Sequence, residues 1–244
     1  MMNLNKTLYH NSPYFFGLFF LFALLAFWPG YFGRLFGDIP THIHIHGITM
    51  TVWCLMLIGQ GFLIRLKKQR IHKTVGKVSY LLVPLIVISG FNSAHYLLSR
   101  ANMPPENFYS NAALMFNSLI AFGIIYGLAI KNRKQPLVHA RYMVATIFPI
   151  ITPLTDRLIH HHARPILNLV PALNGAPSVY VAGFVLAEVL LIGLVIWDWQ
   201  FNRKMVAFRV ALGIVLLYHI STLFFYHFSL WQGITDWIMG LPLS

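Results

Sequence analysis

Histidine is the residue type that most strongly suggests chemistry in this chain, which contains 12 of them among 244 residues. An imidazole changes its charge near neutral pH and is also the commonest metal ligand in proteins. The histidines gather in a few short stretches, of which 42–46 and 160–162 are the densest. Their positions therefore provide the first candidates for a binding or catalytic site.

One group of histidines has spacings that suggest a metal site. His42 and His46 are four residues apart, which brings two side chains onto one face of a helix, and Asp156 and His160 have the same spacing. Imidazole suits zinc, copper, iron and nickel, and an added carboxylate is compatible with zinc or non-haem iron. We predict that these four residues and His95 converge on a metal. The alternative is that they contact phosphate, water or backbone carbonyls at a membrane surface, because no specific motif such as His-Glu-x-x-His is present.

A second pair, His72 and His139, lies among basic residues in two other parts of the chain. Each histidine lies at the start of an apolar segment, and the two segments are expected to run in the same direction. The two imidazoles would then lie at similar depth and could face each other, as the axial ligands of a six-coordinate haem do. Contact with lipid phosphate is the alternative interpretation.

Glu188 lies about nine residues inside a long apolar segment, and His219 lies at similar depth in the next one. A carboxylate within a membrane is costly unless it faces the protein interior and has a partner. We predict that Glu188 and His219 pair and take part in proton transfer or support a cofactor. A buried structural hydrogen bond with a protonated Glu188 is the alternative.

Arg157 follows Asp156 near the end of another apolar segment. A guanidinium in this position could bind a haem propionate or a substrate, so we include Arg157 among the cofactor-binding candidates. It could equally extend toward lipid headgroups while its aliphatic part stays in the apolar region.

The elements that position these residues are membrane-spanning helices. The chain is 57% hydrophobic and only 10% charged, whereas soluble domains carry about 25% charged residues. Its apolar runs are continuous and about 20 residues long, the length of a membrane-spanning helix. We predict an all-α polytopic membrane protein with about seven transmembrane helices. The predicted spans are Pro13–Phe36, His44–Leu66, Val75–Leu98, Tyr109–Ile130, Leu137–Ile159, Val179–Trp199 and Met205–Phe228.

The seven spans are expected to form a single transmembrane bundle over residues 1–244, with core helices over 44–159 and peripheral helices over 13–36, 179–199 and 205–228. Fourteen of the 18 Lys and Arg residues fall on one side of this arrangement. The positive-inside rule then places the N-terminus in the cytoplasm and the C-terminus outside. The protein is thus predicted to be multi-pass in the bacterial inner (plasma) membrane. This asymmetry also accounts for the net charge of +12 without a nucleic acid partner.

Several short motifs resemble those of cytochrome b561-like membrane proteins. They also resemble, more closely, a group of bacterial membrane proteins with a His-Arg-x-x-Gly element after one helix and a His-x-Arg-Trp-Met element before another. The corresponding elements here are His72-Lys-Thr-Val-Gly76 and His139-Ala-Arg-Tyr-Met143. The further matching residues are His46-Gly-Ile-Thr-Met50, Leu63-Ile-Arg65, Gly90 and His95.

The resemblance covers the second to fifth spans, about half of the chain, and it implies an inner haem held by His72 and His139. The family's outer haem needs histidines on the spans that correspond to the second and fourth here. His46 lies on the second span, but the fourth has no histidine, and Asn111 lies near the position where one would be required. The outer end therefore departs from the family pattern.

Three functions follow as hypotheses. The first is a membrane redox protein that binds haem b or a transition metal (Fe, Cu or Zn) and passes electrons or protons between the two faces, or to a quinone or another electron partner. The second is a membrane metalloenzyme, a hydrolase or oxygenase, working at the outer rim with Glu188 or Asp156 as base. The third is a proton-coupled transporter or an assembly factor.

Overall fold

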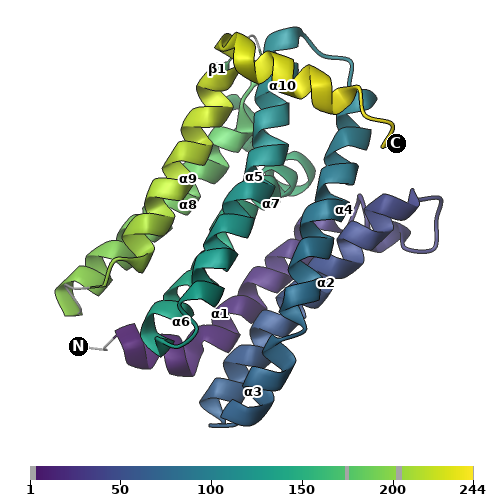
Figure 1. Cartoon of the computed structure of the whole chain (residues 1–244). Helices are drawn as coiled ribbons and strands as arrows, with labels where there is room; N and C mark the ends of the chain where they lie inside the picture. Colours follow the sequence, from purple (N-terminus) through teal and green to yellow (C-terminus); the bar gives the residue numbers. More distant parts are fainter. Residues whose placement is uncertain (1–3, 174–175, 202–204, 244) are drawn as a thin grey trace.

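The computed structural model describes residues 4–173, 176–201 and 205–243, and these residues are almost entirely helical (Figure 1). The α-helices are α1 (Leu4–Phe27), α2 (Thr41–Arg65), α3 (Gln69–Gly76), α4 (Ser79–Ser99), α5 (Pro105–Lys131), α6 (Pro136–Ala145), α7 (Phe148–His162), α8 (Val179–Phe201), α9 (Ala207–Phe224) and α10 (Ser229–Met239). Short 3-10 helices cover Phe32–Arg34, Arg164–Asn168 and Phe225–His227, and two antiparallel two-residue strands, β1 (Ala172–Leu173) and β2 (Ala176–Pro177), pair in the loop before α8.

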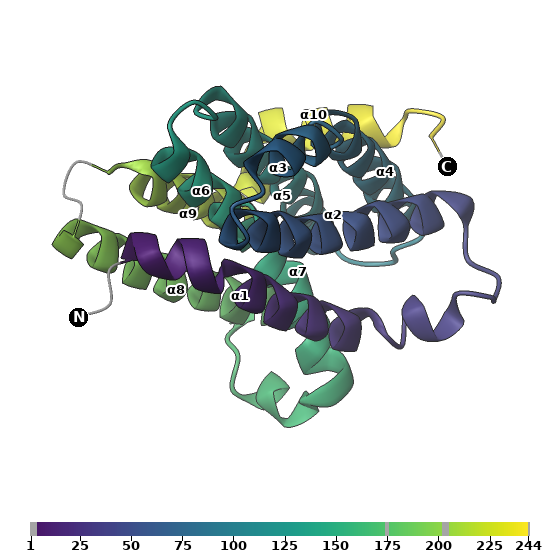
Figure 2. The same cartoon turned by 90° about the horizontal axis from the view of Figure 1, so that it is seen from below.

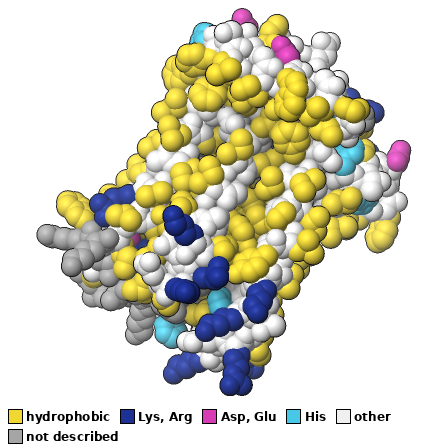
Figure 3. Space-filling view, viewed as in Figure 1, with side chains coloured by type: hydrophobic (Ala, Val, Ile, Leu, Met, Phe, Trp, Pro, Cys, Tyr) yellow, Lys and Arg dark blue, Asp and Glu magenta, His cyan; other side chains and the backbone are white. Residues whose placement is uncertain are grey.

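The predicted seven-span fold is confirmed. Within the described part of the chain, seven helical stretches are long and apolar enough to cross a membrane, with α3 and α4 forming the third and α6 and α7 the fifth. The large exposed side chains along the helices are mostly Leu, Ile, Val and Phe. Figure 3 shows these hydrophobic side chains along the flank of the bundle, and Lys and Arg gathered at the end that carries α3 and α6. We call this the basic end, and the opposite one, near α10, the histidine end.

The fifth span is the centre of the bundle. Half of it is buried, the largest share among the seven spans. It packs against α1, α5, α8 and α9, while contacts of α1 with α2, α2 with α4, α4 with α5, α5 with α9 and α9 with α8 form a surrounding ring. The span divides because Pro149 has no N–H and its ring would meet the carbonyl of residue 145, where α6 ends.

Two span boundaries differ from those expected. The first helix ends at Phe27 rather than Phe36, so that prediction is wrong. Pro29 disfavours the helical conformation at the residue before it, and Gly30 follows. The second helix begins earlier than expected, directly after Pro40, so that His42 and His46 lie on one helix. The amphipathic helix α10, which crosses the histidine end (Figure 1), was not predicted.

Polar side chains join neighbouring helices inside the bundle, as expected where water is absent. Asn117 of α5 donates to Ser221 Oγ of α9 at 2.8 Å. The hydroxyl of Tyr218 in α9 donates to the carbonyl of Leu114 in α5, also at 2.8 Å. These bonds fix the rotation of α9 on α5, and with it the direction of the neighbouring His219.

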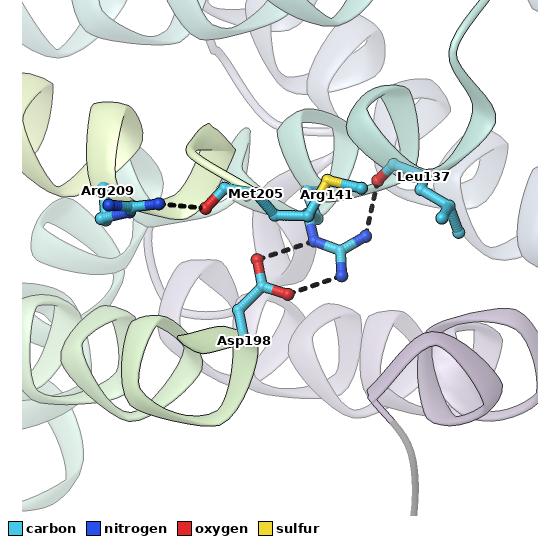
Figure 4. A network of polar contacts seen from close by, with 5 residues as sticks. All are labelled: Leu137, Arg141, Asp198, Met205 and Arg209. Atoms are coloured by element: carbon cyan, nitrogen blue, oxygen red, sulfur yellow. Dashed lines mark hydrogen bonds and ion pairs between the residues drawn. The ribbon is translucent and has the colours of Figure 1, made fainter. Parts of the chain in front are cut away.

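A buried ion pair links the central span to α8 (Figure 4). Arg141 of α6 donates from Nη2 and Nε to the two oxygens of Asp198 at 2.6 and 2.8 Å, and from Nη1 to the carbonyl of Leu137 at 2.8 Å. The exposed fractions of the two side chains are 0% and 3%. Such a bidentate pair has the geometry in which a guanidinium and a carboxylate interact most strongly.

We predict that Asp198→Ala destabilises the protein by about 3–5 kcal/mol, because it leaves the Arg141 charge buried and uncompensated. Thermal unfolding in detergent measures the effect, with Asp236→Asn, at an exposed tyrosine contact, as control. The double variant Arg141→Met/Asp198→Leu should recover much of the loss. An Asp198→Ala protein as stable as the wild type would show that the pair does not hold α6 to α8.

Candidate functional site

His72 of α3 and His139 of α6 lie close together at the basic end. Their ring centroids are 6.4 Å apart and the ring planes are inclined by 81°. His139 is fixed by a hydrogen bond of 2.8 Å between Nδ1 and the carbonyl of Ala129 near the end of α5. Because a carbonyl only accepts, Nδ1 carries the proton and Nε2 keeps its lone pair.

His72 is held from the other side by Gln60, a buried residue of α2. The Gln60 amide is satisfied in one orientation, in which its nitrogen donates to the His72 carbonyl at 3.2 Å and its oxygen accepts from the Gly76 N–H at 3.1 Å. The same amide nitrogen donates to His72 Nδ1. Because the amide nitrogen donates to Nδ1, a neutral His72 carries its proton on Nε2.

The spacing of this histidine pair corresponds to that of two imidazoles sharing one metal ion. With metal–nitrogen bonds of about 2.0–2.1 Å, the centroids of two opposed rings lie about 6 Å apart. His139 already has the arrangement of a metal ligand, with Nδ1 donating to a carbonyl and Nε2 available. His72 would have the same arrangement if the Gln60 amide turned so that its oxygen accepted a hydrogen bond from Nδ1.

At the histidine end, His46 is packed tightly onto α4. A Cβ added to Gly90 would come within 2.9 Å of His46 Cε1, so the glycine is needed where the ring crosses the helix. The Ser89 hydroxyl donates to the Leu85 carbonyl at 2.6 Å, and its oxygen accepts from His46 Nδ1 at 3.3 Å. The orientation of the imidazole is thus set by α4.

His42 lies one turn before His46 on the same helix. Its ring is 4.5 Å from that of Tyr96 on α4, and the Ser93 hydroxyl donates to its backbone carbonyl at 3.4 Å. His95 is buried in α4, just after Ala94, which packs in the apolar cluster where α4 meets α5 and α10.

Asp156 and His160 lie on α7, which packs against α1 and α8 rather than against α4. His160 Nδ1 donates to the Asp156 backbone carbonyl at 2.9 Å and lies 3.4 Å from its carboxylate. Arg157 Nη1 donates to the carbonyl of Pro153 at 3.2 Å, and its guanidinium carbon lies 5.1 Å from the centre of the Phe27 ring. Figure 2 shows the end of α7 projecting away from α2 and α4.

The predicted convergence of His42, His46, His95, Asp156 and His160 is therefore not found. Among the described residues, no three His, Cys, Asp or Glu side chains lie close enough to hold a metal ion. The spacing correctly placed His42 with His46, and Asp156 with His160, each pair on its own helix. The direction of α7 separates the second pair from the first.

The predicted pairing of Glu188 in α8 with His219 in α9 is present. Glu188 Oε1 lies 2.8 Å from His219 Nδ1, and both side chains are about 85% buried, with exposed fractions of 14% and 15%. The His219 ring stacks on Phe184 with the centroids 4.3 Å apart and the planes inclined by 6°. His219 Nε2 is buried and has no hydrogen-bond partner among the described residues. A fixed imidazole with a free nitrogen can hold or pass on a proton.

Asp198, the partner of Arg141, was not predicted. It is one of six acidic residues and stands in an apolar run between Trp197 and Trp199, which is the kind of signal that identified Glu188. The contact of Gln60 with His72 was not predicted either. Nothing in its position indicated this contact, because α3 folds back beside α2 only through the turn after Arg65.

We predict that the Glu188–His219 contact contributes about 1–3 kcal/mol, because each substitution leaves a buried polar group unpaired. A double-mutant cycle with Glu188→Ala and His219→Ala, followed by thermal unfolding, measures this coupling. The Asn117→Ala/Ser221→Ala cycle, which tests a neutral pair on the adjoining helices, provides the comparison. Additive effects of Glu188→Ala and His219→Ala would contradict the pairing.

Comparison of the chain with protein-family models, with curated proteins and with solved structures finds no match. The functional argument consequently rests on the side-chain geometry described above.

Proposed function

We propose that this multi-pass membrane protein binds haem b between His72 and His139 and transfers electrons within the membrane. The observation that supports the proposal is the 6.4 Å separation of the two ring centroids, which would allow His72 and His139 to hold one haem between them. The separate placement of the two histidines on α3 and α6 also fits, since cofactors in helix bundles are held by facing helices.

The number of protein ligands favours haem over a bare metal ion. A zinc, copper or iron ion held by protein alone generally needs three or four ligands, and the described residues contain no such group. A haem supplies four nitrogens of its own, so two histidines complete its coordination. Bound haem would supply one-electron redox chemistry, and lipid-soluble quinones or another donor would be its electron partners.

The residues around the pair would orient the ligands. The carbonyl of Ala129 holds the proton of His139 on Nδ1, which leaves Nε2 to bind the metal. Gln60 would do the same for His72 by presenting its amide oxygen to Nδ1. The basic side chains of α3 agree with a cytoplasmic location of this end in a bacterial plasma membrane.

We expect the protein purified in detergent to carry about one haem per chain, with a Soret band that His72→Ala and His139→Ala remove. Absorption spectra together with elemental analysis for iron, copper and zinc measure this. His44→Ala, at the opposite end, is the control. Gln60→Leu should weaken haem retention by about 10–100-fold, as loss of a group that orients a metal ligand does.

Absence of a Soret band and of stoichiometric metal would refute the proposal. A metal without haem, lost in His46→Ala and kept in His72→Ala, would instead support a metalloenzyme at the histidine end.

The Glu188–His219 pair supports a second candidate, a proton-coupled function such as transport. A carboxylate and an imidazole in contact within the membrane can exchange a proton. We expect Glu188→Gln to reduce proton flux in proteoliposomes about tenfold or more, since the amide keeps the size but holds no exchangeable acidic proton. Asn117→Ala, which removes a neutral interhelical bond, is the control. Equal flux in Glu188→Gln and the wild type would argue against this function.

A further inference from the structure

The short helix α3 has three different faces. On the inner face, His72 and Gly76 meet Gln60 of α2. Ile71 and Val75 form a second face, and their exposed fractions are 47% and 38%. The third face is exposed and basic. Its residues, spaced three and four apart as on one side of a helix, are Arg70, Lys73 and Lys77. Two of the three faces therefore lie outside the protein interior.

The exposed apolar face of α3 continues along α4. Val78 lies in the turn between the two helices, where the backbone stays helical, and 56% of it is exposed. Further exposed apolar residues follow at intervals of three or four, namely Leu81, Leu85 and Ile88. Because α3 and α4 belong to one candidate span, this stripe faces the hydrocarbon of the membrane. The apolar face of α3 then lies at the edge of the hydrocarbon, beside a basic face at the level of the headgroups.

The cations of α3 form no ion pair with a carboxylate among the described residues. The sequence contains no Asp or Glu between Asp38 and Glu106. At the basic end the described residues form one ion pair, Arg141 with Asp198, whose two carboxylate oxygens are already bound. Figure 3 shows Lys and Arg side chains projecting from this end. Such a surface attracts anionic groups from outside the chain.

The turn between α2 and α3 adds a cation at an unfavourable position. Lys67 has a φ of 58°, the left-handed conformation in which a side chain is disfavoured and glycine is usual. The backbone needs this conformation to end α2, because two consecutive N–H groups of the turn donate to the carbonyls of Leu63 and Ile64 at 2.8 and 2.9 Å. Lys67 is exposed. A lysine at a position that suits glycine agrees with a use for its charge at this surface.

We propose that residues 66–78 bind the headgroups of anionic phospholipids. Ile71, Val75 and Val78 enter the edge of the hydrocarbon, and the basic face, together with Lys67, binds the phosphate groups. Lipid is favoured over a soluble acidic partner because the apolar face continues into the membrane-facing stripe of α4, where a soluble partner does not reach. This site does not depend on haem binding, although the same helix carries His72.

The test compares two lipids that have the same acyl chains and differ in headgroup charge. The protein is held in a detergent with an uncharged sugar headgroup. Native mass spectrometry counts the bound phosphatidylglycerol or phosphatidylcholine as the lipid concentration is raised. One variant removes the basic face of α3 and is Arg70→Gln/Lys73→Gln/Lys77→Gln. The matched control removes three exposed cations from the end of α5 and the loop after it, also at the basic end, and is Lys131→Gln/Arg133→Gln/Lys134→Gln.

We expect the wild type to bind phosphatidylglycerol about tenfold or more tightly than phosphatidylcholine, because each Lys or Arg near an anionic surface raises the affinity about fivefold. The variant of the basic face should lose most of this preference, and the control variant should keep it. Ile71→Ser/Val75→Ser should weaken the binding of both lipids, since it removes contacts with the acyl chains. Polyglutamate, a soluble polyanion, should not displace phosphatidylglycerol.

Equal binding of the two lipids by the wild type would overturn the proposal. An equal loss of preference in both triple variants would do so as well, since net charge alone would then explain it. Displacement of phosphatidylglycerol by polyglutamate would assign the surface to a soluble acidic partner instead. If the variant of the basic face does not fold, the effect of salt on the wild type decides. Salt should remove the preference for phosphatidylglycerol, and a preference that persists in salt would contradict contacts between exposed cations and headgroups.

Discussion

The Arg141–Asp198 pair is the interaction on which the arrangement of the bundle most depends. A buried guanidinium without a counterion is strongly destabilising in an apolar environment, and so is a buried carboxylate without one. The pair is tolerable only if the fifth span stands next to α8 at the depth where both oxygens of Asp198 meet Arg141. This requirement sets the depth of the central helix relative to α8, and the other spans surround that helix.

The same rule explains the remaining polar contacts. Asn117 with Ser221, Glu188 with His219, and Gln60 with His72 each join two helices by side chains that would be unsatisfied apart. A bilayer gives little hydrophobic reason for one apolar helix to prefer another, so these pairs supply specificity. Arg157 departs from this rule among the described residues, because its hydrogen bond is to the Pro153 carbonyl of its own helix rather than to a side chain of another helix.

Much of the fold could be predicted from the sequence because the length and composition of each span are local properties. The Glu188–His219 pair was predictable as well, since two ionisable groups at one depth on consecutive spans have few other partners. The separation of Asp156 and His160 from the histidines of α2 and α4 was not predictable. It depended on the direction of α7, which follows from the break at Pro149 and from packing against α1 and α8. Asp198 has the same local signal as Glu188, but its partner Arg141 lies close to the start of the expected fifth span, where a cation is ordinarily an interfacial residue.

One face of α2 connects the two ends of the molecule. His46 and Gln60 are fourteen residues apart, which is close to four turns and a rise of about 21 Å at 1.5 Å per residue. Both therefore point to nearly the same side, and Thr49, Trp53 and Leu57 fill the buried stripe between them. Trp53 is fully enclosed and packs edge-on against Phe122 and Tyr126 of α5. A helix held this firmly at its middle keeps His46 and Gln60 in fixed positions, so the side chains at both ends of this face are oriented by the same rigid element rather than by a loop.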